Sequence, residues 1–408
     1  MRYRDLGLSD FSMLHGADKE HPHGGVVVTE FIDQIEPCLL RIAIDKAMQR
    51  FPYWLVTLHK GFTDVWFERN TNEVVLAKDK LKMSLGGKEA NGHLLAFSYI
   101  DNKLLLHFSH ILLDGYGLAT LLRTIILYYC QLRYDKNLTN VDALTFDTPM
   151  SEDELRDPLS SEIPQDLPKK SNPKIPQAFR PDWLGLVNVT TQQVHHISIS
   201  SEQVDDFCNR YSVTPPVMID VLFARALHSI HPDVSQPIVS GMPASVRSLT
   251  GCQQSMLNAT IPLRIVHNAK FWQMSLEQQL FEVRKQIKAQ TESCVMWTEM
   301  KALVKLFKML RCMPDFLRAF IMPRAFAKAV AINSYDLSFT GRMRLNETNK
   351  YVKSCFINAA YKGSGMMMQM LSLDNSLCIS YCQEWQDAIY LDRFLREMEE
   401  VGFSVNHH

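Results

Sequence analysis

One short motif in this sequence combines residue types that can carry acid–base chemistry: His110-Ile-Leu-Leu-Asp114-Gly115. A histidine, with an ordinary pKa of about 6.5, can accept a proton near neutral pH and return it later in a reaction. The composition predicts only about 0.06 chance occurrences of H-x-x-x-[D/E]-G in this chain. The motif therefore indicates a general base at position 110. The alternative is structural, with the histidine closing a strand and Asp114 capping the next helix.

Strand and helix signals on either side of the motif indicate how His110 is presented. Alternating apolar residues predict a β-hairpin, Leu94–Tyr99 and Lys103–His110, joined by an Asp101-Asn102 turn. A largely buried helix is predicted at Leu118–Gln131, and two glycines precede it. Such a turn exposes one side chain at the end of a sheet, where a reacting group must be reachable.

Strand and helix signals also alternate in the residues before this hairpin. Asp33 to Glu36 matches a capping box, Pro37 suits the first turn of a helix, and Phe51-Pro52 ends that helix. Three β-rich runs predict strands, at Tyr53–His59, Val65–Arg69 and Val74–Ala77.

Residues 151–185 differ in composition from the rest of the chain. Six of the 18 prolines lie there, among Ser, Asp and Lys residues. Because prolines at this density disfavour helices and central strands, we expect a crossover linker between an N-terminal half, 1–150, and a C-terminal half, 186–408. The later half is expected to contain strands and helices at Val194–Ser200, Pro237–Ser240, Ala259–Ile265, Ser275–Thr291, Cys355–Tyr361, Met367–Cys382 and Ala388–Val401.

The two halves share a short internal match. Asp101-Asn102 in the first hairpin corresponds to Asp374-Asn375 in the last, and a strand and a helix follow each turn. In this register Asp114 aligns with Asp387, while His110 aligns with Gln383. We favour an internal duplication in which one half kept the histidine. Coincidence of two similar turns is the alternative.

The overall composition limits the classes of function. The 408 residues include 43 Lys+Arg and 44 Asp+Glu, a formal charge of -1. No strong net field is available to hold a nucleic acid, so we expect no such partner. The sequence lacks G-x-x-x-x-G-K-[ST] and G-x-G-x-x-G, so nucleotide hydrolysis and dinucleotide redox chemistry have no support.

Three absences predict the compartment. The charged start, Met1-Arg-Tyr-Arg, is unlike a secretory leader, and no window has the ~18–20 uncharged apolar residues of a membrane helix. The nine cysteines are an odd number without C-x-x-C or zinc-type spacing. We expect a cytoplasmic protein with reduced thiols and no metal site.

Two other features have structural explanations. His195-His196 lie on a predicted strand and His228 and His231 on a predicted helix, without a third metal ligand at useful spacing. Residues 296–330 carry seven basic and two acidic residues. We favour helices packed on their own domain with a solvated cationic face. Docking of an acidic carrier protein, phosphates of coenzyme A, or a membrane surface are the alternatives, the membrane being the least favoured.

The motif and several other segments resemble the chloramphenicol-acetyltransferase-like acyltransferases, which include condensation domains, polyketide-associated acyltransferases, alcohol acetyltransferases and the plant BAHD enzymes. The similar pieces run in the family's order over nearly the whole chain. They are Phe31 to Pro52, His110 to Gly115, Pro243 to Arg247, Leu257 to Arg264 and Leu337 to Gly341.

Departures from the family pattern narrow the resemblance. Condensation domains usually carry two adjacent histidines at the start of this motif. In this chain Ser109 occupies the position of the first histidine. The plant "DFGWG" element is absent, and Phe339 stands where the family often has Asn. These departures favour a stand-alone microbial alcohol- or amine-acyltransferase, and they leave open a relative that has lost turnover.

The resemblance implies a fold of class α/β, an α+β sandwich of two similar halves. Each half is expected to be a mixed, mostly antiparallel sheet with helices, and an active-site channel is expected between them. His110 is implied as the catalytic base, and Asp114, Gly115 and Arg247 as the structural motif, with Arg247 paired to Asp114. Three more residues are implied as substrate-lining: Ser109, Ser338 and Thr340.

The implied activity is transfer of an acyl group from a thioester to a hydroxyl or amine. The partners are then a small acyl donor and acceptor, and no cofactor is permanently bound. Coenzyme A, or the phosphopantetheine arm of an acyl-carrier protein, would supply the thioester as co-substrate. Two alternatives remain at this point: a catalytically inactive binding or scaffold protein, and a carrier-dependent condensation-type enzyme of lipid or peptide biosynthesis.

Overall fold

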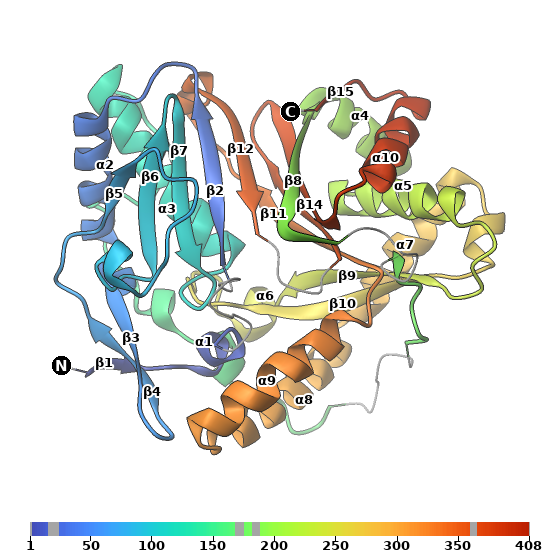
Figure 1. The fold of residues 1–408 in the computed structure, drawn as a ribbon, viewed down its shortest axis with the longest axis horizontal. Coiled ribbons are helices and arrows are strands. Elements are labelled where there is room, and N and C mark those ends of the chain that lie inside the picture. Colours follow the sequence, from blue (N-terminus) through green and yellow to red (C-terminus); the bar gives the residue numbers. More distant parts are fainter. Residues whose placement is uncertain (1, 15–23, 168–174, 182–187, 360–364, 408) are drawn as a thin grey trace.

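Two large mixed sheets, each accompanied by helices, make up the two lobes of the molecule (Figure 1). The computed structural model describes residues 2–14, 24–167, 175–181, 188–359 and 365–407. The sheet of the N-terminal lobe has five strands and that of the C-terminal lobe has seven. Most neighbouring strands are antiparallel, with parallel pairs in both sheets. The predicted α/β class with two lobes is confirmed.

The N-terminal lobe is built on the strand order β12-β2-β7-β6-β5, with a three-stranded sheet, β1-β4-β3, beside it. Its elements are β1 (Arg2–Asp5), α1 (Leu8–Ser12), β2 (Gly24–Phe31), α2 (Pro37–Arg50), β3 (Val56–Lys60), β4 (Val65–Arg69), β5 (Leu76–Lys78), β6 (Leu95–Ile100), β7 (Lys103–Ser109), α3 (Gly115–Arg133) and β12 (Val352–Asn358). The hairpin and both long helices predicted for this part are confirmed.

The C-terminal lobe is built on the strand order β10-β9-β11-β13-β14-β8-β15. Its strands are β8 (Asn188–Ser200), β9 (Ile238–Ser245), β10 (Thr260–His267), β11 (Tyr335–Arg342), β13 (Met366–Ser372), β14 (Ser376–Trp385) and β15 (Val405–His407). Its helices are α4 (Ser201–Tyr211), α5 (Pro215–Ile230), α6 (Arg247–Thr250), α7 (Leu276–Gln290), α8 (Ser293–Arg311), α9 (Asp315–Val330) and α10 (Ile389–Glu400).

The two sheets share a four-strand arrangement. In the N-terminal lobe the first strand, β2, pairs with the second strand of the β6–β7 hairpin, and β5 runs parallel to its first strand. In the C-terminal lobe β8, the β13–β14 hairpin and β11 repeat these pairings and directions. The helices α3 and α10 follow the two hairpins. This common topology supports the internal duplication.

One strand crosses between the halves of the sequence. β12, from residues 352–358, pairs antiparallel with β2 and forms the edge of the N-terminal sheet. The division into 1–150 and 186–408 did not include this exchange. Because strand pairing is a long-range contact, the local pattern of residues 352–358 predicted a strand but not its sheet.

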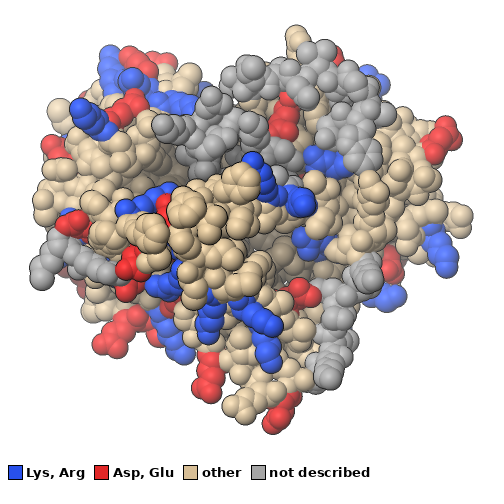
Figure 2. All heavy atoms as spheres, turned by 60° about the horizontal axis from the view of Figure 1, so that its bottom comes forward, with Lys and Arg blue, Asp and Glu red and all other residues tan. Residues whose placement is uncertain are grey.

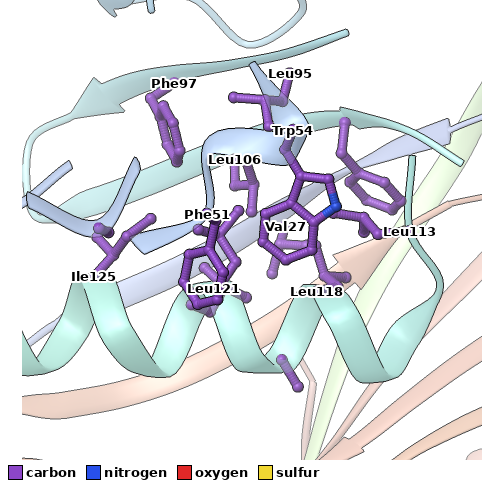
Figure 3. Close-up of a cluster of buried hydrophobic side chains, with 14 of the residues drawn as sticks. Val27, Phe51, Trp54, Leu95, Phe97, Leu106, Leu113, Leu118, Leu121 and Ile125 are labelled. Carbon is purple, nitrogen blue, oxygen red and sulfur yellow. The ribbon is translucent and has the colours of Figure 1, made fainter. Parts of the chain in front are cut away.

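A packed core holds α3 under the N-terminal sheet (Figure 3). Leu118, Leu121 and Ile125 recur along one face of α3 and meet fully or almost fully buried side chains such as Phe51 and Trp54. These contacts fix the start of α3, and therefore the loop that joins β7 to it.

Two local predictions differ from the structure. Asp33 makes no capping box; its carboxylate accepts a hydrogen bond from the Tyr134 hydroxyl, and Glu36 is the N-cap of α2 without a side-chain bond. Residues 151–160 are not a loose connection. Glu154 is buried, and its carboxylate binds the Arg50 guanidinium at 2.6 and 3.0 Å. Parts of the predicted linker, 168–174 and 182–187, lie outside the described residues.

Candidate active site

His110 lies at the junction of the two lobes, immediately after the end of β7. Its side chain is half-buried. Its backbone carbonyl accepts a hydrogen bond of 2.6 Å from the side-chain amide of Asn258, which belongs to the C-terminal half. The preceding residue, Ser109, is the last of β7 and pairs with Gly24 of β2. The histidine is therefore held by contacts from both lobes.

Asp114 caps the helix that follows. One carboxylate oxygen, Oδ1, accepts hydrogen bonds from the backbone N–H groups of Tyr116 and Gly117, at 3.1 and 3.4 Å. The other oxygen, Oδ2, accepts one from the Ala259 N–H at 3.2 Å. Only 4% of Asp114 is exposed. Its position as N-cap explains why α3 starts at Gly115.

Arg247 forms a two-point ion pair with Asp114. Its Nη1 and Nη2 atoms donate to Oδ2 and Oδ1, both at 2.8 Å. Its remaining donors bind the backbone carbonyls of Ser255 and Leu257, and its guanidinium lies over the Tyr116 ring. Because the two side chains are paired through two hydrogen bonds and their other polar atoms are also hydrogen-bonded, both buried charges are compensated. The pair ties the start of α3 to the C-terminal lobe.

Gly115 allows a second contact between the lobes. A Cβ atom added at this position would lie 2.9 Å from the Thr340 hydroxyl of β11. Thr340 therefore lies against the loop of the motif. Ser338 lies two residues earlier on the same strand. Both side chains are half-buried.

A second histidine, which lies on β7 itself, has a different environment. His107 is 2% exposed, and its Nε2 atom lies 2.8 Å from the Ser98 hydroxyl. Because the Ser98 proton is directed to the Lys80 carbonyl, His107 donates to the serine oxygen. Burial lowers the pKa of His107 to about 4. A histidine this buried is held in its neutral form inside the sheet.

Two residues at the site were not assigned a role from the sequence. Asn258 occurs in a segment that carried the family resemblance, and Tyr116 directly follows another, but nothing local indicated their contacts. The signal for Asn258 was its place in Leu257-Asn258-Ala-Thr, next to the predicted strand. Its use as a donor to His110 depends on how the two halves meet.

Comparisons with solved structures show which fold this is. The chain superimposes on the epimerization domain from the third module of tyrocidine synthetase B with a TM-score of 0.61, at 10% identity, covering 98% of this chain and 96% of that one. It matches a trichothecene 15-O-acetyltransferase of Fusarium sporotrichioides with a TM-score of 0.61, at 11% identity, covering 97% and 94%. It matches F. graminearum TRI101, solved with coenzyme A and T-2 mycotoxin, with a TM-score of 0.61, at 9% identity, covering 100% and 99%. The chain has the chloramphenicol-acetyltransferase-like fold.

At the level of sequence, no family model matches the chain, and no curated protein matches it either. Identities of 9–11% establish the shared fold alone. What this chain does must therefore be argued from its own residues.

The histidines for which the sequence predicted a structural role lie apart from one another in structural contacts. His196 bonds the Asn358 side chain at 2.8 Å, His231 bonds the Tyr390 hydroxyl at 2.9 Å, and His228 stacks on Trp272. Burial lowers the pKa values of His195, His228 and His231. Within the described residues, no group of three His, Cys, Asp or Glu side chains is placed to hold a metal.

Two cavities are described, and His110 lines neither. One of about 20 Å³ lies between α1, the β3–β4 turn and Arg318. An open one of about 400 Å³ lies between Pro176, Arg264 and Ile332. The channel expected between the lobes of the chloramphenicol-acetyltransferase-like fold stays a prediction. Among the described helices, none by itself is long and apolar enough to cross a bilayer; only α4 and α5 together are, and they are bent by 87°.

Proposed function

We propose that this protein is an acyltransferase that moves an acyl group from a thioester to a hydroxyl or amine acceptor, with His110 as general base. The observation that carries the proposal is the difference in environment between Asp114 and His110. Asp114 is buried and fully engaged by Arg247 and three backbone N–H groups, while His110 stays half-exposed between the lobes. The aspartate thus holds the loop, and the histidine side chain is the reactive group.

The chemistry needs one proton carrier. A neutral imidazole nitrogen of His110 takes the proton of the acceptor O–H or N–H as that atom attacks the thioester carbonyl. The carbonyl electron pair moves to oxygen and then returns, breaking the C–S bond. The leaving thiolate takes the proton from the imidazolium. The products are an ester or amide and a free thiol, and the histidine returns to its starting state.

Thr340 and Ser338 are the proposed lining on the C-terminal side. The hydroxyl of Thr340 lies against Gly115, so β11 borders the loop that carries His110. Hydroxyl groups at this position would donate to the carbonyl oxygen as its charge develops, or to the acceptor. Ser109 is proposed to line the site from β7.

Coenzyme A is the proposed thiol carrier for the first assays, because a structure of the same fold was solved with it. A carrier-protein thioester is the second donor class. Nine cysteines, all free in the structure, suit a reducing compartment, so we place the protein in the cytoplasm.

The test is thiol release from a panel of acyl-CoA thioesters, with and without added alcohols and amines. The parent protein should release thiol faster when an acceptor is present, and His110→Ala should lower the rate about 10²–10⁴-fold. His59→Ala is the matched control, since His59 lies on β3 and stacks on Trp66; it should keep the parent rate.

Two outcomes would count against the proposal. Retention of the parent rate by His110→Ala would remove the histidine from the reaction. A parent protein that turns over neither acyl-CoA nor carrier-bound thioesters, yet binds them, would favour the scaffold alternative.

A further inference from the structure

The helices α8 and α9 pack on the molecule by only part of their surface. The side of α8 that faces the protein is apolar, with Met296, Met300 and Val304 buried. On α9, Arg318 and Met322 are the buried side chains among those described. Arg318 donates to the Thr63 carbonyl at 2.8 Å and to Asp315 at 3.2 Å, which anchors α9 to the β3–β4 turn. Val295 and Leu310 of α8 are buried as well, and much of the remaining surface of the pair faces outward.

The outward side is rich in large apolar groups. Seven of the 19 exposed large hydrophobic side chains of the described structure gather there, although the two helices and the β3–β4 turn are a small part of the chain. Phe62, Phe316 and Phe320 are 73%, 63% and 60% exposed. We call this area the α8–α9 surface; its apolar members are Phe62, Leu306, Met309, Phe316, Leu317, Phe320 and Ile321.

Helical spacing makes the α9 members of this surface contiguous. Positions 316, 317, 320, 321, 324 and 328 recur at three- and four-residue intervals and form one stripe along α9. Phe62 of the β3–β4 turn extends the stripe, because its ring centroid lies 6.3 Å from that of Phe316. Exposed apolar groups that form a continuous patch mark an interaction surface more often than scattered ones do.

The same surface is positively charged. Figure 2 views the side on which α8 and α9 lie, and Lys and Arg groups border uncharged surface there. Among the described residues of 296–330, six cations are exposed, whereas Asp315 is engaged by Arg318 and Glu299 is half-buried. The exposed cations are Lys301, Lys305, Lys308, Arg311, Arg324 and Lys328. With a formal charge of -1 for the whole chain, this is a local concentration of positive charge.

We propose that the α8–α9 surface docks onto an anionic phospholipid bilayer. Phenylalanine and leucine on one stripe, with lysine and arginine beside them, are typical of helices that lie in the headgroup region. The apolar groups are exposed, and a fluid bilayer can accept them without a matching groove. The cations select acidic headgroups. The sequence pattern had favoured simple packing; the exposure of the phenylalanines changes that preference.

The proposal is tested by co-sedimentation with vesicles. The full chain should bind vesicles of phosphatidylglycerol and phosphatidylcholine at least about tenfold more tightly than pure phosphatidylcholine, and the preference should weaken with salt. Phe316→Ser/Phe320→Ser should weaken binding at least about fivefold by removing apolar contact. Lys301→Glu/Lys305→Glu/Lys308→Glu should weaken it more than about tenfold by reversing charge.

A matched control distinguishes binding through the α8–α9 surface from nonspecific binding through any exposed phenylalanine. Phe146 and Phe281 are 63% and 64% exposed elsewhere in the chain, so Phe146→Ser/Phe281→Ser should bind like the parent. Thermal unfolding of each variant checks that it is folded, which is expected because the changed side chains are exposed.

Equal binding to both vesicle types, or unchanged binding by Phe316→Ser/Phe320→Ser, would overturn the proposal. So would tight binding of an acidic acyl-carrier protein to this surface without vesicle binding. None of these outcomes bears on acyl transfer, which is assayed without lipid.

Discussion

At the scale of single residues, Asp114 and His110 stand in opposite environments only four positions apart. Asp114 accepts hydrogen bonds from three backbone N–H groups and from both terminal nitrogens of Arg247, and it is almost completely buried. His110 is half-exposed and is held through its backbone by Asn258. The two residues should therefore respond very differently to mutation.

We expect Asp114→Ala to lower the free energy of unfolding by about 3–5 kcal/mol, because it leaves the buried Arg247 without its partner. It also removes the cap of α3. His110→Ala should change stability by less than about 1 kcal/mol. Thermal unfolding of the purified variants measures both effects. If His110→Ala were the strongly destabilised variant and Asp114→Ala melted like the parent, the assignment of roles would be wrong.

His107 gives a prediction on pH. Burial lowers its pKa in the folded state from 6.5 to about 4, so the unfolded chain binds the proton first as pH falls. The neutral native histidine thus contributes stability that is fully present above about pH 6.5 and is lost as pH falls toward 4, by up to about 3 kcal/mol. In His107→Gln this loss is absent, because glutamine does not titrate.

Urea unfolding of the parent and His107→Gln at several pH values isolates this contribution from other histidines. The difference in unfolding free energy, parent minus variant, should fall between pH 6.5 and 4. A difference that does not change with pH would show that His107 titrates in the folded protein as it does in the unfolded chain.

At the scale of elements, the start of α3 and the strand β11 meet through Gly115 and Thr340. An added Cβ would lie 2.9 Å from the threonine hydroxyl and 3.0 Å from its methyl group. Alanine is intrinsically the better helix former, by about 1 kcal/mol. At position 115 the close contact of the added Cβ with Thr340 opposes this gain in helix propensity. The stability of Gly115→Ala therefore shows which of the two effects is larger.

We expect Gly115→Ala to destabilise the protein by about 1–3 kcal/mol, since overpacking exceeds the gain in helix propensity. Thr340→Ala removes the two nearest atoms, so the double variant should recover part of the loss. Equilibrium unfolding of the parent, both single variants and the double variant gives the coupling between the two positions. Simple additivity of the two changes would mean that α3 and β11 are not in contact in solution.

At the scale of the whole molecule, the two lobes are joined by more than the chain between them. β12 contributes its hydrogen bonds to β2, and the core of the N-terminal lobe includes Met256, Met343 and Leu345 from the later half. The backbone carbonyl of Glu154 accepts a hydrogen bond of 2.8 Å from the Met256 N–H, and Asp114 is paired with Arg247. The lobes should therefore hold together after the connection is cut.

Limited proteolysis should first cut the proline-rich connection after Ser160, because residues 161–167 are largely exposed whereas Glu154 and Leu159 are buried. The nicked protein should elute in size-exclusion chromatography at the volume of the intact chain and separate only in denaturant. First cleavage within residues 94–131 would contradict the two-lobed architecture. Separation of the pieces under native conditions would contradict the role of β12.

The sequence by itself determined the local elements and the motif. The hairpin β6–β7, the helices α2, α3 and α10, and the last hairpin could be predicted because their apolar periods of 2 and 3.6 residues, turn residues and helix ends lie within a few positions of one another. The motif could be found because its histidine, aspartate and glycine lie within six consecutive residues.

Only the tertiary structure decided which distant residues complete the site. Arg247 lies 133 positions after Asp114 and Asn258 lies 148 after His110; the resemblance suggested the first pair, and nothing suggested the second. The sheet that β12 joins, and the side of α8 and α9 that stays exposed, depend likewise on the path of the whole chain. Local periodicity specifies which face of an element is apolar, but the surface that covers that face is set by contacts between residues far apart in sequence.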